Sequence, residues 1–467
     1  MTLWKKWWSL VRLLRPAFSR ERTFLWFAAA LAAMMIRSDQ AGVTSFVRAL
    51  ALSPELYGQL LAIFHSSAIK VDRLAALWTA VVLKSFPGVV RIKGRPVFLG
   101  DGIKRGKEGR KMPGVKCLHQ ESGSNSKAPF IMGHSCQVLA ALTSVAGYFF
   151  AVPLVSRIHE GVVVSNRDAR TLMDKMLAML SNLMLSTPVY LVLDAYYGTR
   201  KMILGLTEQG HHLICRVKKT TVAYYEAPMA TQRKRGRPKF YGEKILLRSL
   251  FETAAFTVAQ SPVYGESDVE ILYYAVDLLW KPVGRLVRFV FVKHPTRGNI
   301  VLITTDMLLS ALDIIELYGL RFKIEVAFKQ AVHTIGTFSY HFWMKDMTPI
   351  KRRGGNQYLH RKPKEYRDGV ARKMRAYHAH MQLGVIAQGM MQYLSMLAQQ
   401  EVWSSFGSWL RTIRPDVLPS EQVVQSAMRN TFSEFLAGSD GDVPLAKFLA
   451  ERCTRSEQMP GRLASSE

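Results

Sequence analysis

The sequence has few cysteines, few acidic residues and no long apolar run. Only four of its 467 residues are cysteine, and no two of them form a C-x-x-C pair. This argues against a disulfide framework and suits a reducing cytoplasm. The apolar run Phe24–Ile36 holds 13 residues, too few to cross a bilayer, and no small-residue cleavage site follows it. We therefore expect a buried helix there, and no membrane span in the chain.

Acidic residues are scarce relative to basic ones. The chain carries 35 Asp and Glu against 63 Lys and Arg, which gives a formal net charge of +28 and a pI near 10.0. Such a field attracts polyanions, so nucleic acid is the expected partner and an anionic membrane surface is the alternative. The hydrophobic fraction of 49% is ordinary for a globular protein, and the length suits two or three domains.

Composition and periodicity change several times along the chain. Residues 1–85 carry helical periodicity and few strand signals, which suits either a packing domain or a DNA-binding domain. Strands dominate after Pro87-Gly88 and then alternate with helices, a pattern typical of a layered α/β fold. We predict five segments: a helical domain (1–85), an α/β core (86–217), a β-rich insertion (218–305), a helix-bearing continuation of the core (306–350), and a basic loop with a helical C-terminal region (351–467).

Two aspartates follow apolar strands. Val89–Leu99 alternates and leads through Gly100 to Asp101, which we expect at the end of a second short strand. Val189 begins a nearly continuous apolar run that closes on Asp194, as in a strand buried on both faces. In open α/β sheets ligands bind at the carboxyl ends of the strands, so these two carboxylates are candidate site residues.

A third acid lies on a predicted helix from Tyr318 to Gln330. At about 100° per residue, Tyr318, Arg321, Glu325 and Lys329 fall on one stripe of that helix. A solvated face is the plain interpretation of such a stripe. The two strand-end aspartates favour a second one, in which Glu325 joins Asp101 and Asp194.

Three converging carboxylates suit a hard divalent cation. Neighbouring carboxylates do not both ionise cheaply unless a cation lies between them, and oxygen ligands favour Mg²⁺ or Mn²⁺. Two such ions about 4 Å apart can activate an attacking oxygen and stabilise a leaving oxygen at phosphorus. Arg321 and Lys329, one turn to either side of Glu325, could then neutralise DNA phosphates.

These residues resemble a known family. Asp101, Asp194 and Glu325, with the spacing Tyr318-x2-Arg321-x3-Glu325, are similar to the DDE transposases of bacterial insertion sequences. The most similar group carries the signature Tyr-x2-Arg-x3-Glu-x6-Lys and a β-strand insertion before the glutamate. In this chain Val332 occupies the place of the signature lysine, and Lys329 lies on the same stripe as Glu325.

The resemblance implies both a fold and an activity. The fold would be an RNase H-like mixed sheet flanked by helices, with a β-rich insertion before the glutamate helix and helical regions at both ends. The three acids would hold Mg²⁺ or Mn²⁺, as a pair of ions, for cleavage of transposon ends and strand transfer into target DNA. The partners would be terminal inverted repeats, target DNA and a second copy of the chain, in the nucleoid of the cytoplasm. The alternative is a decayed or repurposed transposase that binds DNA without cutting it.

Further residues are candidates for DNA contact. Lys104 and Arg105 begin a predicted basic loop, and Arg235-Gly236-Arg237-Pro238 resembles an AT-hook, whose arginines enter the narrow minor groove of A·T-rich DNA. A solvated basic loop is the alternative for that motif. Trp280 could stack on a flipped base, as an insertion aromatic does in relatives, or it could pack in the core.

One cluster of soft ligands has a competing interpretation. Cys117-x-His119 and His134-x-Cys136 could meet across a hairpin and hold zinc, because residues two apart on a strand share a face. The spacing is not a common zinc pattern, so ordinary strand residues are the alternative. His134 and His333 lie near the expected site in sequence, although a lone histidine is more often structural.

Overall fold

The computed structural model describes residues 2–120, 128–228, 239–407, 412–438 and 443–453. The chain divides into two compact units. The first, here called the helical unit, comprises residues 1–81, 105–134 and 329–467. The second, here called the sheet unit, comprises residues 82–104 and 135–328. Arg235 and Arg237 of the AT-hook-like motif lie outside the described residues.

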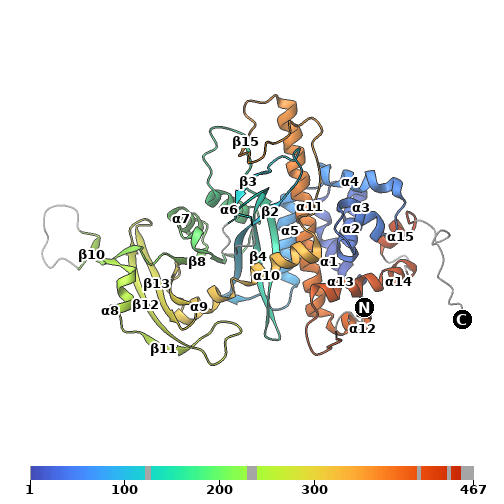
Figure 1. Ribbon diagram of the computed structural model, residues 1–467. Helices are drawn as coiled ribbons and strands as arrows, with labels where there is room; N and C mark the ends of the chain where they lie inside the picture. Colours follow the sequence, from blue (N-terminus) through green and yellow to red (C-terminus); the bar gives the residue numbers. More distant parts are fainter. Residues whose placement is uncertain (1, 121–127, 229–238, 408–411, 439–442, 454–467) are drawn as a thin grey trace. The chain divides into compact units, whose positions relative to one another are not determined.

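The helical unit is organised around α2 (Glu21–Ile36) and the long helix α11 (Lys364–Leu397), which pack against each other (Figure 1). Residues 28–35 of α2 are fully buried, which confirms the predicted buried helix. The other helices of this unit are α1 (Leu3–Val11), α3 (Gly42–Ala49), α4 (Tyr57–His65), α5 (Val71–Ser85), α12 (Gln399–Phe406), α13 (Glu421–Asn430), α14 (Phe432–Ala437) and α15 (Pro444–Ala450). In the part of the chain that the structure describes, no helix is both long and apolar enough for a bilayer span.

A buried arginine joins distant segments of the helical unit. Arg37, just after α2, donates from Nη2 to the carbonyl oxygens of Ile335 (2.6 Å) and Gly336 (3.2 Å). Its Nη1 donates to Ser45 Oγ at 3.0 Å. Burial lowers the pKa of Arg37 to about 10, which leaves the guanidinium charged at neutral pH. The accepting carbonyls close a π-helical turn, Ala331–Ile335, that follows helix α10 (Lys323–Gln330).

The sheet unit contains an RNase H-like sheet, as predicted. Its strand order is β5-β4-β2-β7-β8, with β7 parallel to both β2 and β8, and β4 antiparallel to β5. The strands are β1 (Arg91–Ile92), β2 (Arg95–Gly106), β4 (Phe130–Val145), β5 (Tyr148–Ile158), β7 (Tyr190–Leu193) and β8 (His212–Val217). Helices α6 (Leu172–Ser181) and α7 (Arg200–Glu208) form the crossovers on either side of β7.

The predicted β-rich insertion is confirmed, and it extends the same sheet. Strand β14 pairs antiparallel with β8, and β13, β12, β9 and β10 continue outward from β14. The insertion comprises β9 (Val222–Glu226), β10 (Tyr241–Leu246), α8 (Leu250–Thr253), β11 (Thr257–Gln260), β12 (Glu270–Trp280), β13 (Arg285–His294) and β14 (Gly298–Thr304). Trp280 is only 7% exposed at the end of β12, so it packs in the core and cannot stack on a base from solvent.

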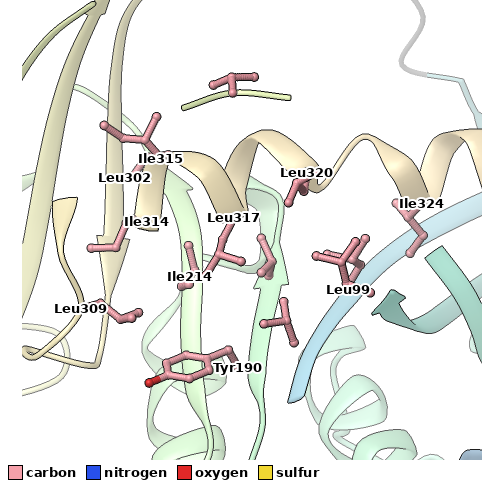
Figure 2. Close-up of a cluster of buried hydrophobic side chains, with 14 of the residues drawn as sticks. Leu99, Tyr190, Ile214, Leu302, Leu309, Ile314, Ile315, Leu317, Leu320 and Ile324 are labelled. Atoms are coloured by element: carbon pink, nitrogen blue, oxygen red, sulfur yellow. The ribbon is translucent and has the colours of Figure 1, made fainter. Parts of the chain in front are cut away.

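Helix α9 (Ala311–Leu320) and helix α10 cover one face of this sheet. Ser310 caps α9 by accepting the backbone N–H of Asp313 at 3.1 Å. Figure 2 shows Leu317, Leu320 and Ile324 directed at strand residues that include Leu99 and Ile214. Because these side chains are fully or almost fully buried, the hydrophobic effect fixes the position of both helices on the sheet.

Two details differ from the prediction. Asp101 lies inside strand β2 rather than at its end, because the chain stays extended to Gly106. The predicted helix from Tyr318 to Gln330 is two helices. At the junction, Arg321, Ile324 and Glu325 donate their backbone N–H groups to residues three positions earlier, which tightens the chain between α9 and α10.

Candidate functional site

Asp101 and Asp194 lie side by side on neighbouring parallel strands. The register pairs Leu99 of β2 with Val192 of β7, so Asp101, two residues further along β2, comes level with Asp194, the residue that follows β7. Both acids continue the alternation that directs Leu99 and Val192 into the core under α9 and α10. Adjacent strands are about 4.8 Å apart, so the two carboxylates share one edge of the apolar face.

Glycines beside the acids leave room for this arrangement. A Cβ on Gly100 would lie 2.5 Å from Leu193 Cδ2, so a larger residue next to Asp101 on β2 would require Leu193 to move. After Asp194 the chain turns sharply through a 3₁₀ segment, Ala195–Tyr197, and Asp194 Oδ1 accepts the backbone N–H of Tyr196 at 3.1 Å. The 3₁₀ turn that follows Asp194 therefore fixes this residue at the C-terminal end of strand β7.

Arg321 joins the third acid to the first. Its Nη1 donates to Asp101 Oδ2 and its Nη2 to Glu325 Oε1, both at 2.9 Å. The side chains of Arg321 and Asp101 are 19% and 18% exposed, whereas Glu325 is 58% exposed. The junction between α9 and α10 thus places one guanidinium between a mostly buried carboxylate of the sheet and an exposed carboxylate of the helix.

The charges of the three acids act on one another. Burial raises the pKa of Asp101, and the negative charges of Asp194 and Glu325 raise it further, against the Gly102 N–H and Arg321, which lower it. Burial also raises the pKa of Tyr197, with a further contribution from Asp101 and Asp194. The three carboxylates are therefore close enough for their charges to interact, and such grouping of acids is a property of sites that bind cations.

The donor set fits a hard divalent cation. Asp101, Asp194 and Glu325 offer only carboxylate oxygens, the ligands that Mg²⁺ and Mn²⁺ prefer. Within the described residues, no three acids, histidines or cysteines stand close enough to hold an ion without rearrangement. The carboxylates of Asp101 and Glu325 both point toward the guanidinium of Arg321, with which they form ion pairs. These ion pairs account for part of the distance between the two carboxylates.

Sequence reasoning missed one residue of this site, Arg216. The register pairs Val192 of β7 with Ile214 of β8, so Arg216 follows in the same row as Asp101 and Asp194. Arg216 is exposed, and its charge lowers the pKa of Tyr318, although burial, the largest influence, raises that pKa overall. The period-2 alternation of β8 could have revealed it, because Arg216 is the one Lys or Arg residue in that strand.

The other predicted DNA-binding residues are spread over several elements. Tyr318 is partly buried against the core of the sheet unit, and Lys329 is exposed in the last turn of α10. Lys104 and Arg105 belong to strand β2 and not to a loop, which corrects the prediction. Val332, at the place of the signature lysine, lies in the π-helical turn, where its carbonyl oxygen accepts Gln40 Nε2 at 3.0 Å.

The zinc interpretation is wrong for the described residues. Strand β3 (Lys116–His119) pairs with β4 in a register that places Cys117 opposite Met132 and His119 opposite Phe130. The buried His134 instead contacts Tyr340 Oη at 2.7 Å and the carbonyl oxygen of Pro113 at 2.9 Å through its two ring nitrogens. Burial lowers the pKa of His134 to about 3, so it is a neutral structural histidine.

Comparisons with known proteins identify the family of the chain. A family model described as DDE superfamily endonuclease matches residues 13–260, more than half of the chain. The match includes Asp101 and Asp194 and ends before Glu325. No curated protein matches the chain. Among solved structures, the chain is similar to piggyBac transposase in a synaptic complex with hairpin DNA, at 9% identity over 95% of this chain and 78% of that chain, with a TM-score of 0.35. A TM-score this low supports no structural inference.

Proposed function

The chain belongs to the DDE superfamily of endonucleases, and we propose that it is a DNA transposase that cleaves transposon ends and joins them to target DNA. The observation that carries this proposal is the row of Asp101 and Asp194 at two neighbouring inner strands of the sheet, β2 and β7. Glu325 is joined to this row through Arg321. Fixed carboxylates beside exposed cations are suited to phosphoryl transfer, in which catalysis consists mostly of positioning and charge stabilisation.

Asp101, Asp194 and Glu325 would hold the divalent cations, Mg²⁺ or Mn²⁺, that the chemistry requires. Two such ions, when bound, supply Lewis-acid stabilisation of the attacking and leaving oxygens at phosphorus. Asp101 and Asp194 are fixed by strands, while Glu325 is exposed on a helix and able to turn toward them. The sheet thus supplies the rigid half of the cage and α10 the adjustable half.

Water would attack the phosphodiester at the transposon end in line with the leaving 3′ oxygen. The new bond joins the water oxygen to phosphorus, the bond from phosphorus to the 3′ oxygen breaks, and the 3′ oxygen takes a proton. The freed 3′ hydroxyl then attacks a phosphodiester of target DNA in the same way. No covalent enzyme intermediate and no ATP are needed in this scheme.

Cations next to the acids would hold the DNA backbone. Arg216 lies in the row of the two aspartates, and Arg321 and Lys329 flank Glu325 along the helical segment. Tyr318 and Lys104 add a phenol and an ammonium to the sheet unit. Each such cation neutralises a phosphate and releases a counterion, so binding should weaken steeply with salt.

We further propose roles for the rest of the chain. The N-terminal helices would bind the terminal inverted repeats, and the C-terminal helices would support a homodimer on paired ends. Arg105 would contribute to the DNA surface, and Arg235 and Arg237 would enter a minor groove. The expected place of action is the nucleoid of a cytoplasm.

An excision assay tests the proposal. A plasmid carries the gene with its native flanking DNA, and PCR detects the repaired empty site. We expect excision with wild type and none with Asp194→Ala or Glu325→Ala. Glu252→Ala, which removes an exposed acid on α8, is the matched control and should excise normally. Excision that survives both site substitutions would refute the site.

The alternative is a DNA-binding protein that no longer cuts. If neither wild type nor any variant excises, purified wild type is incubated with end DNA and Mg²⁺ or Mn²⁺. Metal-dependent nicking that Asp194→Ala abolishes supports the transposase. Tight binding without nicking, in wild type and in Asp194→Ala alike, supports the decayed protein.

A further inference from the structure

Two segments of the helical unit that are distant in sequence are joined by a series of hydrogen bonds. The backbone N–H of Met344 donates to the carbonyl of Lys111 at 2.9 Å, and that of Ile350 to the carbonyl of Arg110 at 2.8 Å. Lys111 Nζ donates to the carbonyl of Lys345 at 3.0 Å. The basic segment after β2 is therefore fixed against the segment that follows the π-helical turn.

This join gathers positive charge on one part of the helical unit. Six exposed cations lie on the two segments, and none of them pairs with an acid among the described residues: Arg110, Lys111, Lys345, Lys351, Arg352 and Arg353. Glu108 and Asp346 are exposed acids on the same segments, so the six cations leave a net positive charge there, which attracts an anionic ligand.

A tryptophan stands among these cations with most of its surface in water. Trp343 is 63% exposed, while its neighbours Phe342 and Met344 are 6% and 8% exposed and anchor the backbone on both sides. A Cβ on Gly109 would lie 2.9 Å from Trp343 Nε1, so the indole rests against the other segment. An exposed aromatic whose backbone is anchored in this way is typical of an interaction site rather than of a poorly packed loop.

We propose that Trp343, with those six cations, is a second DNA-contact surface, and that its indole stacks on an unpaired base of a DNA end. We call these seven residues the Trp343 surface. The inference rests on the proposed function, because a chain that cleaves transposon ends must hold DNA strands with free termini. Exposed indoles stack on bases of any sequence, while surrounding cations follow the phosphates.

The chemistry of the Trp343 surface differs from that of the acids in the sheet unit. The surface offers a planar π-face and cations, which bind nucleobases and phosphates but perform no reaction. Trp280, the aromatic favoured by family resemblance, is buried and cannot take this role. Among the tryptophans that the structure describes, Trp343 is the one with most of its side chain exposed, so its indole face is accessible to a base.

The test compares two DNA ligands with the full chain in EDTA, so that no cleavage occurs. Fluorescence anisotropy measures Kd for a blunt duplex and for the same duplex with a short single-stranded 3′ overhang. We expect Trp343→Ala to weaken overhang binding about tenfold and to leave blunt-duplex binding within about twofold of wild type. Trp343→Phe should retain most of the overhang preference. Tyr57→Ala, which removes an exposed aromatic of α4, is the matched control and should bind both ligands like wild type.

The cations have their own readout. Arg110→Gln combined with Arg352→Gln should reduce the slope of the logarithm of the duplex binding constant against the logarithm of the salt concentration. The expected reduction corresponds to the loss of about two phosphate contacts. Equal loss of both ligands in Trp343→Ala, or no loss of either, would overturn the stacking role. A change in oligomeric state without a change in DNA affinity would also overturn it, by making this a protein interface. If wild type binds neither ligand and cuts no DNA, the proposed function itself fails.

Discussion

Substitution of Arg321 tests whether its ion pairs with Asp101 and Glu325 stabilise the sheet unit and compete with a divalent metal ion. Arg321→Met deletes both hydrogen bonds to Asp101 and Glu325 and keeps the length of the side chain. The bond to Asp101 joins two mostly buried groups and is charge-assisted, so its loss costs about 1.5–3 kcal/mol. The bond to the exposed Glu325 adds about 0.2–1 kcal/mol. We expect the sheet unit to melt about 4–10 °C lower in EDTA.

The same substitution should strengthen metal binding. In wild type a divalent cation competes with the Arg321 guanidinium for Asp101 and Glu325. In Arg321→Met the carboxylates lose the compensating charge of the guanidinium and repel one another more, so a bound cation relieves a larger electrostatic cost. We expect Mn²⁺ to raise Tm more in the variant than in wild type, with at least about tenfold tighter binding, equivalent to about 1.4 kcal/mol.

The chain offers a matched control for that experiment. Arg288 pairs with Asp277 through two bonds of 2.8 Å, in the same unit and far from the acids in sequence. Arg288→Met should also lower Tm in EDTA, but Mn²⁺ should raise its Tm only as much as it raises that of wild type. The reasoning is refuted if Mn²⁺ shifts wild type and Arg321→Met equally, or if Arg321→Met melts like wild type in EDTA. Differential scanning calorimetry with and without Mn²⁺ supplies both readings.

Two further predictions concern buried acids. Tyr190 Oη donates at 2.5 Å to Asp306, which is 7% exposed, so Tyr190→Phe should lower the unfolding free energy by about 1.5–3 kcal/mol at pH 7 in urea titrations; no loss would contradict the bond. Burial raises the pKa of Glu421 above its ordinary 4.5, so its ionisation destabilises the fold as pH rises above that value. Glu421→Gln, which keeps an acceptor for Gln392, should therefore be more stable than wild type at pH 8 and equal to it near pH 4; a difference that grows toward acid pH would refute this assignment.

Some of the site was predictable because the signals are local. The apolar run that closes on Asp194 is a property of one short segment, and the burial of that strand follows from its composition. The prediction that Arg321 and Glu325 share one stripe comes from helical spacing, and their 2.9 Å contact is present although the chain tightens between α9 and α10.

The remainder depends on tertiary contacts that no local pattern encodes. Asp101 stays in an extended strand, although glycines on both sides favour a turn, because β4 runs beside β2. A Cβ on Gly133 would lie 2.1 Å from the carbonyl oxygen of Arg105, which shows how closely the backbones approach. The exposure of Trp343 likewise depends on hydrogen bonds to a segment more than 200 residues earlier.

The π-helical turn after α10 affects the expected position of the signature lysine, which is defined by its spacing of seven residues from the glutamate. In a continuous α-helix a residue seven positions after Glu325 returns to the same face, since seven residues complete almost two turns. Here α10 ends at Gln330, and the wider π-helical turn follows over Ala331–Ile335. The seventh position, Val332, is the second residue of that turn, so its angle around the helix axis is not given by the α-helical pitch alone. Alignments of relatives across this point should be anchored on the pitch of the helix before residues are equated by number.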